Sequence, residues 1–327
     1  MKVFLGILKW VSIVFLSLVA IIVIIFLVNT DLSNPENTQK FLENKIGKAG
    51  IRGISIAMIK DDQIISTYQA GYANVEENHP VEKDTIFQIA SVSKTITGTA
   101  VVQLHEQGKL DLDDDINDYL PFSIRHPNIP DSPITFRMLL SHTAGMDNNW
   151  EVYDTFYTIS NGGGDSSVSL GEFIEGFFVP DGRYYDAAKN FTKTGPGEAY
   201  QYSNPAYALL GYLVEQISRQ SFPEYCQDRI FEPLDMPNTT WLLADTHIEN
   251  LAIPYEGNEA LPHYSFATYP DGTLKTTPTD YAHFLIAMMN DGRYKGNQIL
   301  QPETIVEMLK PIARDGLQAL TWDYGLL

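Results

Sequence analysis

The chain opens with a long apolar segment and continues as a body in which polar and apolar residues are mixed. Residues 10–28 are uncharged and almost wholly apolar, so a helix of this length would cross the hydrocarbon core of a bilayer. Lys2 and Lys9 precede the segment, and acidic residues follow it. Because positive charge stays on the cytoplasmic side, the pattern predicts a single-pass anchor with the body outside the cell membrane. A cleaved signal peptide is the alternative, but the apolar run exceeds a usual signal core and no clear cleavage site follows it.

Periodicity divides the body into a hairpin and several helices. Residues 54–59 and 63–68 are rich in isoleucine and flank a Lys-Asp-Asp turn, which predicts a β-hairpin. Apolar spacing and helix-start signals predict helices over residues 38–48, 91–107, 205–219 and 302–310, and one more beginning at Thr277. This order of elements favours a mixed α/β chain of the α+β type.

These patterns give a simple domain layout. Residues 1–30 are the predicted signal anchor, and the polar residues 31–39, which include Pro35, are the predicted linker. Residues 40–327 are long enough for one large domain.

Composition narrows the classes of function. The formal net charge is −19, and such a surface repels phosphate backbones, which argues against a nucleic-acid partner. Cys226 is the one cysteine, so no disulfide forms within the chain, and its apolar neighbours predict a buried structural thiol. The histidines show no metal-ligand spacing. The acidic residues 111–118 lack the glycine and final glutamate of a calcium loop, so a solvated turn is expected, with no metal and no cofactor.

The segment Ser91-Val92-Ser93-Lys94 is the first candidate for chemistry. A serine hydroxyl is a weak nucleophile at neutral pH and needs a base beside it. At the start of a helix, residues three apart share a face, so Lys94 would reach Ser91. The helix N-terminus favours negative charge that develops there, and a desolvated lysine serves in proton transfer. The alternative is purely structural, with Ser91 as a helix cap and Lys94 as a solvated surface residue.

A second candidate is Tyr202-Ser203-Asn204. A tyrosine phenol beside an ammonium passes protons to and from a serine and a leaving group. The amide of Asn204 would hold Lys94 and a substrate carbonyl. A structural interpretation also fits, because Asn204-Pro205 has the form of an N-cap followed by the first helical residue. Both interpretations can hold together.

Four segments in matching order resemble the β-lactamase-related serine hydrolases, which include class C β-lactamases, D-alanyl-D-alanine carboxypeptidases, D-aminopeptidases and esterases. The segments are FQIASVSKTITG (87–98), LLSHTAG (139–145), PGEAYQYSN (196–204) and LKTTPTDYAHF (274–284). The resemblance implies a β-lactamase/transpeptidase-like fold, with an antiparallel sheet flanked by helices and a mostly helical lobe. It also implies that Ser91 is acylated, that Lys94 and Tyr202 move protons, and that Asn204 positions the substrate. In LLSHTAG, a structural role at a helix end is expected for His142.

The third motif of that family, Lys-Thr-Gly or His-x-Gly on a C-terminal strand, is not found after Tyr202. Lys193-Thr194-Gly195 matches the letters but precedes Tyr202, so it is interpreted as a loop. Residues 322–327 resemble the segment that opens the C-terminal strands of the family, and there the chain stops. We therefore expect a C-terminally truncated form whose last strands are missing, or a second chain that supplies them. The loss of an oxyanion donor costs about 10²- to 10³-fold in rate.

Four functions stay open at this point. The first is a membrane-anchored hydrolase that forms an acyl-enzyme with small amide, peptide or ester substrates. The second is a β-lactamase with fast deacylation. The third is an inactive penicillin-binding-like or sensing module, and the fourth is a non-functional truncated copy. The sequence does not specify the substrate or the oligomeric state.

Overall fold

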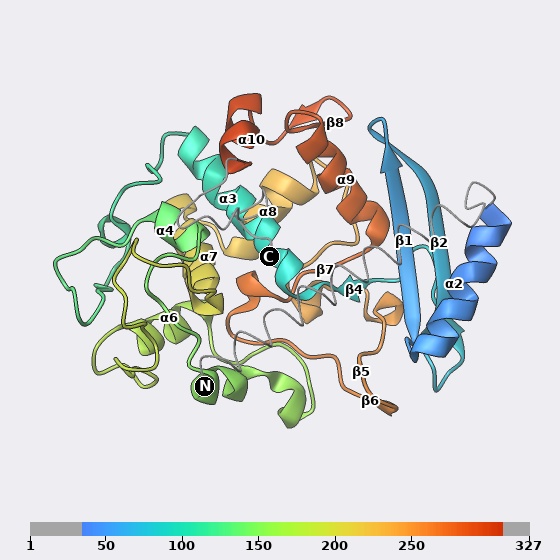
Figure 1. Cartoon of the computed structure of the whole chain (residues 1–327), viewed down its shortest axis with the longest axis horizontal. Coiled ribbons are helices and arrows are strands. Elements are labelled where there is room, and N and C mark those ends of the chain that lie inside the picture. The colour runs from blue at the N-terminus through green and yellow to red at the C-terminus, as the bar shows by residue number, and fades with distance from the viewer. Residues whose placement is uncertain (1–34, 310–327) are drawn as a thin grey trace, which may run out of the picture. The chain divides into compact units, whose positions relative to one another are not determined.

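The computed structural model describes residues 35–309, which form helices and short antiparallel strands (Figure 1). The predicted α+β class is confirmed. The predicted anchor, residues 1–30, lies outside the described residues, as does the segment 322–327. Within residues 35–309, no helix is long and apolar enough to cross a membrane. The predicted linker was too long, because a helix already begins at Pro35.

The helices and strands have the following bounds. The α-helices are α2 (Pro35–Ala49), α3 (Lys94–Glu106), α4 (Phe136–Leu140), α5 (Trp150–Tyr153), α6 (Leu170–Phe178), α7 (Asn204–Ser218), α8 (Phe222–Cys226), α9 (Pro278–Met289) and α10 (Pro302–Met308). The short helical turns are η1 (Ala90–Ser93), η2 (Ile116–Asp118), η3 (Asp154–Phe156), η4 (Thr158–Asn161), η5 (Gln227–Phe231), η6 (Leu243–Asp245), η7 (Ile248–Asn250) and η8 (Tyr269–Asp271). The strands are β1 (Gly53–Lys60), β2 (Gln63–Asn74), β3 (His79–Pro80), β4 (Phe87–Gln88), β5 (Tyr255–Glu256), β6 (Glu259–Ala260), β7 (Lys275–Thr276), β8 (Arg293–Tyr294) and β9 (Asn297–Gln298).

The chain forms two compact units. Among the described residues, the first contains residues 35–55 together with Tyr68–Val81, and the second contains Ile56–Thr67 and residues 82–309. In the first unit, helix α2 contacts strand β2. The side-chain amide of Gln39 in α2 donates to the Gln69 carbonyl in β2 at 2.7 Å. Strand β2 pairs antiparallel with β3.

The predicted hairpin is confirmed as β1 and β2, which are neighbours in a sheet of order β1-β2-β3. Asp61 and Asp62 form the two-residue turn and both have positive φ, 50° and 59°. Left-handed φ at both central residues matches the twist of the flanking strands, and aspartate tolerates it better than most side chains. Among the described residues, this sheet has three strands, all from the N-terminal part of the chain.

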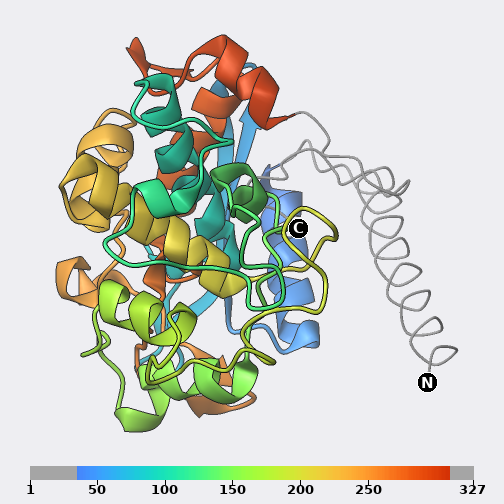
Figure 2. The ribbon, with the colours of Figure 1, turned by 90° about the vertical axis from the view of Figure 1, so that its left-hand side faces the viewer.

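Helix α3 is the centre of the second unit, and α7 packs along it (Figure 1). All residues of α3 from Lys94 to Leu104 are buried. Helix α7 also contacts α4, α6, α8 and η8, and Figure 2 shows α6 beside α7 in a second view. Gly211 of α7 permits the close approach of η8, because a Cβ at this position would lie 2.5 Å from Pro270. The second unit therefore packs around one buried helix, whose lysine, Lys94, lies in its first turn.

The helix predictions hold, with small changes at their starts. The stretch predicted as one helix from Ser91 is a 3₁₀ turn, η1, followed by α3, and Gly108 with φ of 66° ends it as expected. Helix α9 follows Thr277, whose hydroxyl accepts from the Asp280 amide as an N-cap. For α7 the predicted cap was wrong: Ser203 caps the helix, and Asn204 is its first residue.

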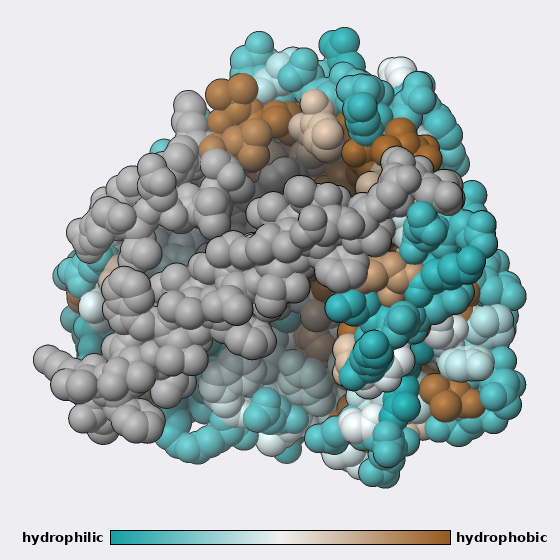
Figure 3. Space-filling view, turned by 45° about the vertical axis from the view of Figure 1, so that its right-hand side comes forward, coloured by the Kyte–Doolittle hydropathy of each residue, from teal (hydrophilic) through white to brown (hydrophobic). Residues whose placement is uncertain are grey.

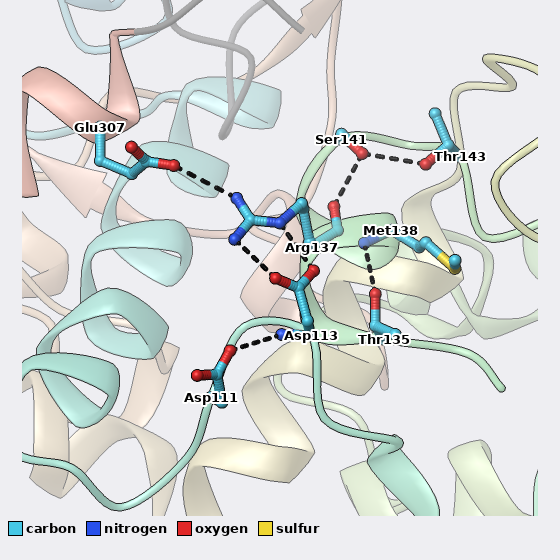
Figure 4. A network of polar contacts seen from close by, with 8 residues as sticks. All are labelled: Asp111, Asp113, Thr135, Arg137, Met138, Ser141, Thr143 and Glu307. Carbon is cyan, nitrogen blue, oxygen red and sulfur yellow. Dashed lines mark hydrogen bonds and ion pairs between the residues drawn. The ribbon is translucent and has the colours of Figure 1, made fainter.

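The acidic segment 111–118 takes part in an ion-pair network (Figure 4). The Arg137 guanidinium donates to both carboxylate oxygens of Asp113, at 2.8 and 3.0 Å, and to Glu307 at 3.3 Å. Asp111 accepts from the Asp113 amide. Asp115 pairs with Arg125 at 2.7 Å. The segment is therefore bound to neighbouring elements more firmly than the predicted solvated turn.

The surface agrees with the strongly acidic composition. On the face in Figure 3, hydrophilic side chains cover most of the described surface, and hydrophobic ones gather in separate small patches. Among the described aromatic residues, Trp150, Tyr200 and Tyr72 are the most exposed, with about half of each residue accessible to solvent.

Candidate active site

Ser91 stands at the surface end of a tightly held turn. Ala90, directly before it, has φ of 46°, a left-handed conformation that is uncommon for a residue with a side chain. The Ser93 hydroxyl donates to the Ala90 carbonyl at 2.5 Å and accepts from the Leu274 amide at 3.0 Å. The turn is further fixed where β4 pairs with β7. Ser91 is exposed while its neighbour Ser93 is fully buried, so the turn presents one hydroxyl and buries the other.

Lys94 lies directly beneath Ser91 and is fully buried. Its Nζ donates to Asn204 Oδ1 at 2.8 Å, to the Asp271 carbonyl at 2.6 Å and to Ser91 Oγ at 3.4 Å. These three acceptors account for all three hydrogens of an ammonium group. Since Lys94 is fully buried, the alternative of a solvated surface lysine is wrong. The three partners matter because burying this side chain without them would be costly.

Tyr202 completes the constellation from the segment before α7. Its phenol donates to Ser91 Oγ at 2.9 Å, and its ring lies 5.1 Å from Lys94 Nζ. All four residues selected from the sequence, Ser91, Lys94, Tyr202 and Asn204, thus meet at one place. Ser91 and Lys94 come from the η1–α3 junction, and the other two come from the start of α7.

His142 supports Tyr202 from behind. It follows the C-cap of α4 with φ of 55°, its ring lies 4.6 Å from the Tyr202 ring, and its Nδ1 accepts from the Ser203 amide at 3.2 Å. Burial, with a smaller effect of the Lys94 charge, lowers the pKa of His142 to about 3. A neutral ring that accepts a backbone hydrogen bond fits the structural role expected for this residue.

Three further residues, Asn148, Asp271 and Tyr153, belong to the site and were missed by the sequence analysis. Asn148 connects Tyr202 to Asn204: its Nδ2 donates to the Tyr202 carbonyl and its Oδ1 accepts from the Asn204 amide, both at 2.9 Å. Asp271 contributes its carbonyl to Lys94. Its carboxylate is buried and accepts from the hydroxyl of Tyr153. The signal in the sequence was an acidic residue three positions before LKTTPTDYAHF.

Other candidate segments lie elsewhere or provide the frame. Lys193-Thr194-Gly195 is in an irregular loop, as expected, where the Gly195 amide donates to Glu198. LKTTPTDYAHF forms β7 and most of α9. Across the described part of the chain, no group of three or more His, Cys, Asp or Glu side chains is arranged to hold a metal ion.

Comparison with known proteins agrees with this geometry. The family model described as Beta-lactamase matches residues 36–327. Protein flp of Staphylococcus aureus (strain N315) is 26% identical over 268 residues, which cover 80% of this chain and 50% of that protein. The chain therefore spans about half the length of this curated relative.

Solved structures show the same fold. The octameric penicillin-binding protein homologue from Pyrococcus abyssi has a TM-score of 0.69 and 25% identity, with 90% of this chain and 64% of that chain covered. The D-amino acid amidase from Ochrobactrum anthropi SV3, in complex with L-phenylalanine amide, has a TM-score of 0.65 at 24% identity, with 88% and 78% covered. The second likeness concerns the fold alone. Together these matches confirm the β-lactamase/transpeptidase-like fold predicted from the sequence.

Proposed function

The chain belongs to the beta-lactamase family of hydrolases, and from that premise we propose that it is a serine hydrolase that forms an acyl-enzyme on Ser91. One observation carries the proposal: the buried Lys94 Nζ and the Tyr202 phenol both form hydrogen bonds with the exposed Ser91 hydroxyl. A nucleophile, a base beside it and an orienting group behind the base are the parts that covalent catalysis needs.

The proposed acylation step moves one proton at each stage. Ser91 Oγ attacks a carbonyl carbon while its proton passes to Lys94 as a neutral amine, whose two remaining N–H groups stay on Asn204 Oδ1 and the Asp271 carbonyl. Tyr202 then donates its phenolic proton to the leaving amine or alcohol as that bond breaks. Lys94 returns its extra proton to Tyr202, and water later hydrolyses the acyl-enzyme and restores Ser91.

The proposed substrates are small amides, peptides or esters. A neutral carbonyl substrate is proposed because each polar residue then has a role: Ser91 attacks the carbonyl carbon, Asn204 holds the carbonyl, and Tyr202 protonates the leaving group. The half-exposed Trp150 packs on Tyr153, and the half-exposed Tyr200 packs on His142, so apolar area lies beside the residues that support the site. Because a D-amino acid amidase has the same fold, D-amino acid amides are the first substrates to try.

The direct test is intact-mass spectrometry of the full 327-residue chain after a fluorophosphonate probe. We expect one adduct on the unmodified chain, none on Ser91→Ala, and an unchanged adduct on Ser132→Ala, a serine in a separate loop. A folded protein without an adduct would contradict the proposal and favour the inactive binding module. With penicillin as the probe, a lasting adduct indicates a penicillin-binding-like enzyme, whereas rapid release indicates a β-lactamase.

We also propose that residues 1–30 anchor the protein in the cell membrane with the hydrolase domain outside. The apolar segment 10–28 and its flanking charges support this. Alkaline carbonate extraction of cell membranes should leave the full chain in the pellet. Recovery in the soluble fraction, or a mature chain that lacks the segment, would favour the cleaved signal peptide instead.

A further inference from the structure

Lys94 is buried and its direct partners are all neutral, yet in the proposed acylation step it becomes a cation when it takes the Ser91 proton. Asn204 and Ser91 offer oxygen atoms without charge, and Asp271 offers its backbone carbonyl. In the part of the chain that the structure describes, none of the ion pairs contains Lys94. A buried ammonium with neutral partners is costly unless a negative charge lies close by. The group that can supply this charge is the side chain of the residue whose carbonyl already contacts Lys94.

The Asp271 carboxylate is buried and held by hydroxyl groups. Its side chain is 3% exposed, and the phenol of Tyr153 donates to Oδ2. The Tyr153 hydroxyl also bonds to the Thr268 hydroxyl. Thr97 of α3 donates to the Pro270 carbonyl at 2.6 Å, which ties η8 to the helix that carries Lys94. Tyr153 therefore holds the carboxylate of Asp271, while the backbone carbonyl of the same residue accepts from Lys94.

We propose that Asp271 is a positioning residue for the serine chemistry: its carboxylate stabilises the positive charge that forms on Lys94 as this residue takes the Ser91 proton. The role corresponds to one part of that of the carboxylate in a Ser-His-Asp triad, which stabilises the protonated form of the base without itself taking the proton. This inference rests on the proposed function of Ser91 and Lys94. It adds a third member, Asp271, with Tyr153 as its anchor.

The proposal makes the acylation rate depend on whether Asp271 is ionised. Burial raises the pKa of Asp271 to about 6, although the charge of Lys94 and the hydrogen bonds from Tyr153 and Thr268 act in the opposite direction. A protonated Asp271 cannot stabilise a cation on Lys94. Acylation should therefore accelerate as the pH rises through about 6.

The tyrosines and the histidine near Asp271 do not account for such a limb, and Glu215 is tested by its own variant. Lys94 faces Asp271 from α3, and Tyr153 and Tyr157 face it from α5 and the end of η3; burial raises the pKa of both tyrosines far above neutrality. His142, whose ring is also affected by the charge of Lys94, has its pKa lowered to about 3, mainly by burial. On α7, burial also raises the pKa of Glu215, whose carboxylate accepts from the Tyr269 hydroxyl and the Phe222 amide. A variant of this residue is therefore needed as a control.

The test is the pH dependence of the fluorophosphonate labelling rate of the full chain between pH 4.5 and 8. The unmodified chain should show an acid limb near pH 6. Asp271→Asn should lose the limb and label roughly tenfold or more slowly at pH 8. Glu215→Gln is the matched control, a half-buried carboxyl beside the same η8 turn, and it should keep the limb.

Tyr153→Phe keeps the carboxyl and removes a hydrogen bond that favours its ionised form. The limb of this variant should move to higher pH, a shift that a merely structural role would not cause. An Asp271→Asn profile that keeps the limb at pH 6 overturns the inference while the proposed function stands. If Asp271→Asn does not unfold cooperatively, Tyr153→Phe decides alone, and an unmoved limb overturns the inference. Absence of any label on the unmodified chain refutes the proposed function instead.

Discussion

Asn148 holds Asn204 in the position from which Asn204 binds Lys94. Asn148 Oδ1 accepts from the Asn204 backbone amide, and Asn148 Nδ2 donates to the Tyr202 carbonyl, both at 2.9 Å. One buried amide therefore sets the backbone on both sides of Ser203, the cap of α7. The two groups that contact Ser91 and Lys94 from this segment depend on it.

We expect Asn148→Ala to slow fluorophosphonate labelling of Ser91 by about tenfold and to lower the free energy of unfolding by about 1–3 kcal/mol, since two buried backbone groups lose their partners. Asn149→Ala is the matched control. Asn149 is the adjacent buried asparagine, and its amide binds Asn190. It should lose stability too, but the folded fraction should label at the normal rate. Equal labelling rates in both variants would contradict a role of Asn148 in the site.

Stability should fall in mild acid because of His142. Burial lowers its pKa from the ordinary value of 6.5 to about 3, so between pH 3 and pH 6.5 the unfolded chain binds a proton that the folded chain does not bind. The free energy of unfolding therefore decreases as the pH falls from 6.5 towards 3, by at most about 5 kcal/mol.

Asp271 acts with the opposite sign. Its pKa is raised to about 6 in the fold, so the folded chain binds the extra proton and gains stability as the pH falls from 6 towards 4. Urea unfolding at pH 7, 5 and 4 should show a weaker acid loss for His142→Asn and a stronger one for Asp271→Asn. Identical slopes for all three proteins would refute both assignments.

The contact between α7 and η8 leaves no room for a methyl group. In Gly211→Ala the new Cβ would lie 2.5 and 2.6 Å from side-chain atoms of Pro270, next to Asp271. We expect a loss of about 1–3 kcal/mol in the free energy of unfolding, together with slower labelling of Ser91. Gly47→Ala is the control: it lies in α2 with nothing within 4 Å of the new Cβ. This variant should gain about 0.5–1 kcal/mol, because alanine favours the helix.

Cys226 should be inert in the folded protein. The thiol is fully buried, and burial raises its pKa above its ordinary value, so few thiolates form and reagents cannot reach them. A chromogenic disulfide reagent should release nothing from the native chain and one equivalent in denaturant. Rapid reaction of the native chain would show that α8 opens readily.

Local patterns along the sequence were sufficient for most elements of the fold. The isoleucine-rich runs predicted β1 and β2, and the spacing of apolar residues predicted α7. The prediction of a helix start fails where two neighbouring residues are both suited to be the N-cap. Asn204-Pro205 has the form of a cap and first residue, but Ser203 takes the cap, and the Asn204 side chain bonds to Lys94 instead.

The sequence by itself determined the pairing of Ser91 with Lys94, because the two lie three positions apart at the start of a helix and local geometry is enough to bring them together. It also selected Tyr202 and Asn204 as residue types suited to this chemistry. Only the tertiary structure decided what surrounds Lys94: Asn204 is 110 residues away along the chain and Asp271 is 177 residues away. Their meeting depends on the packing of α3, α7 and η8, including the room that Gly211 leaves for Pro270. Whether a charged side chain far along the chain is solvated or buried beside a lysine is set by that packing, which no local pattern contains.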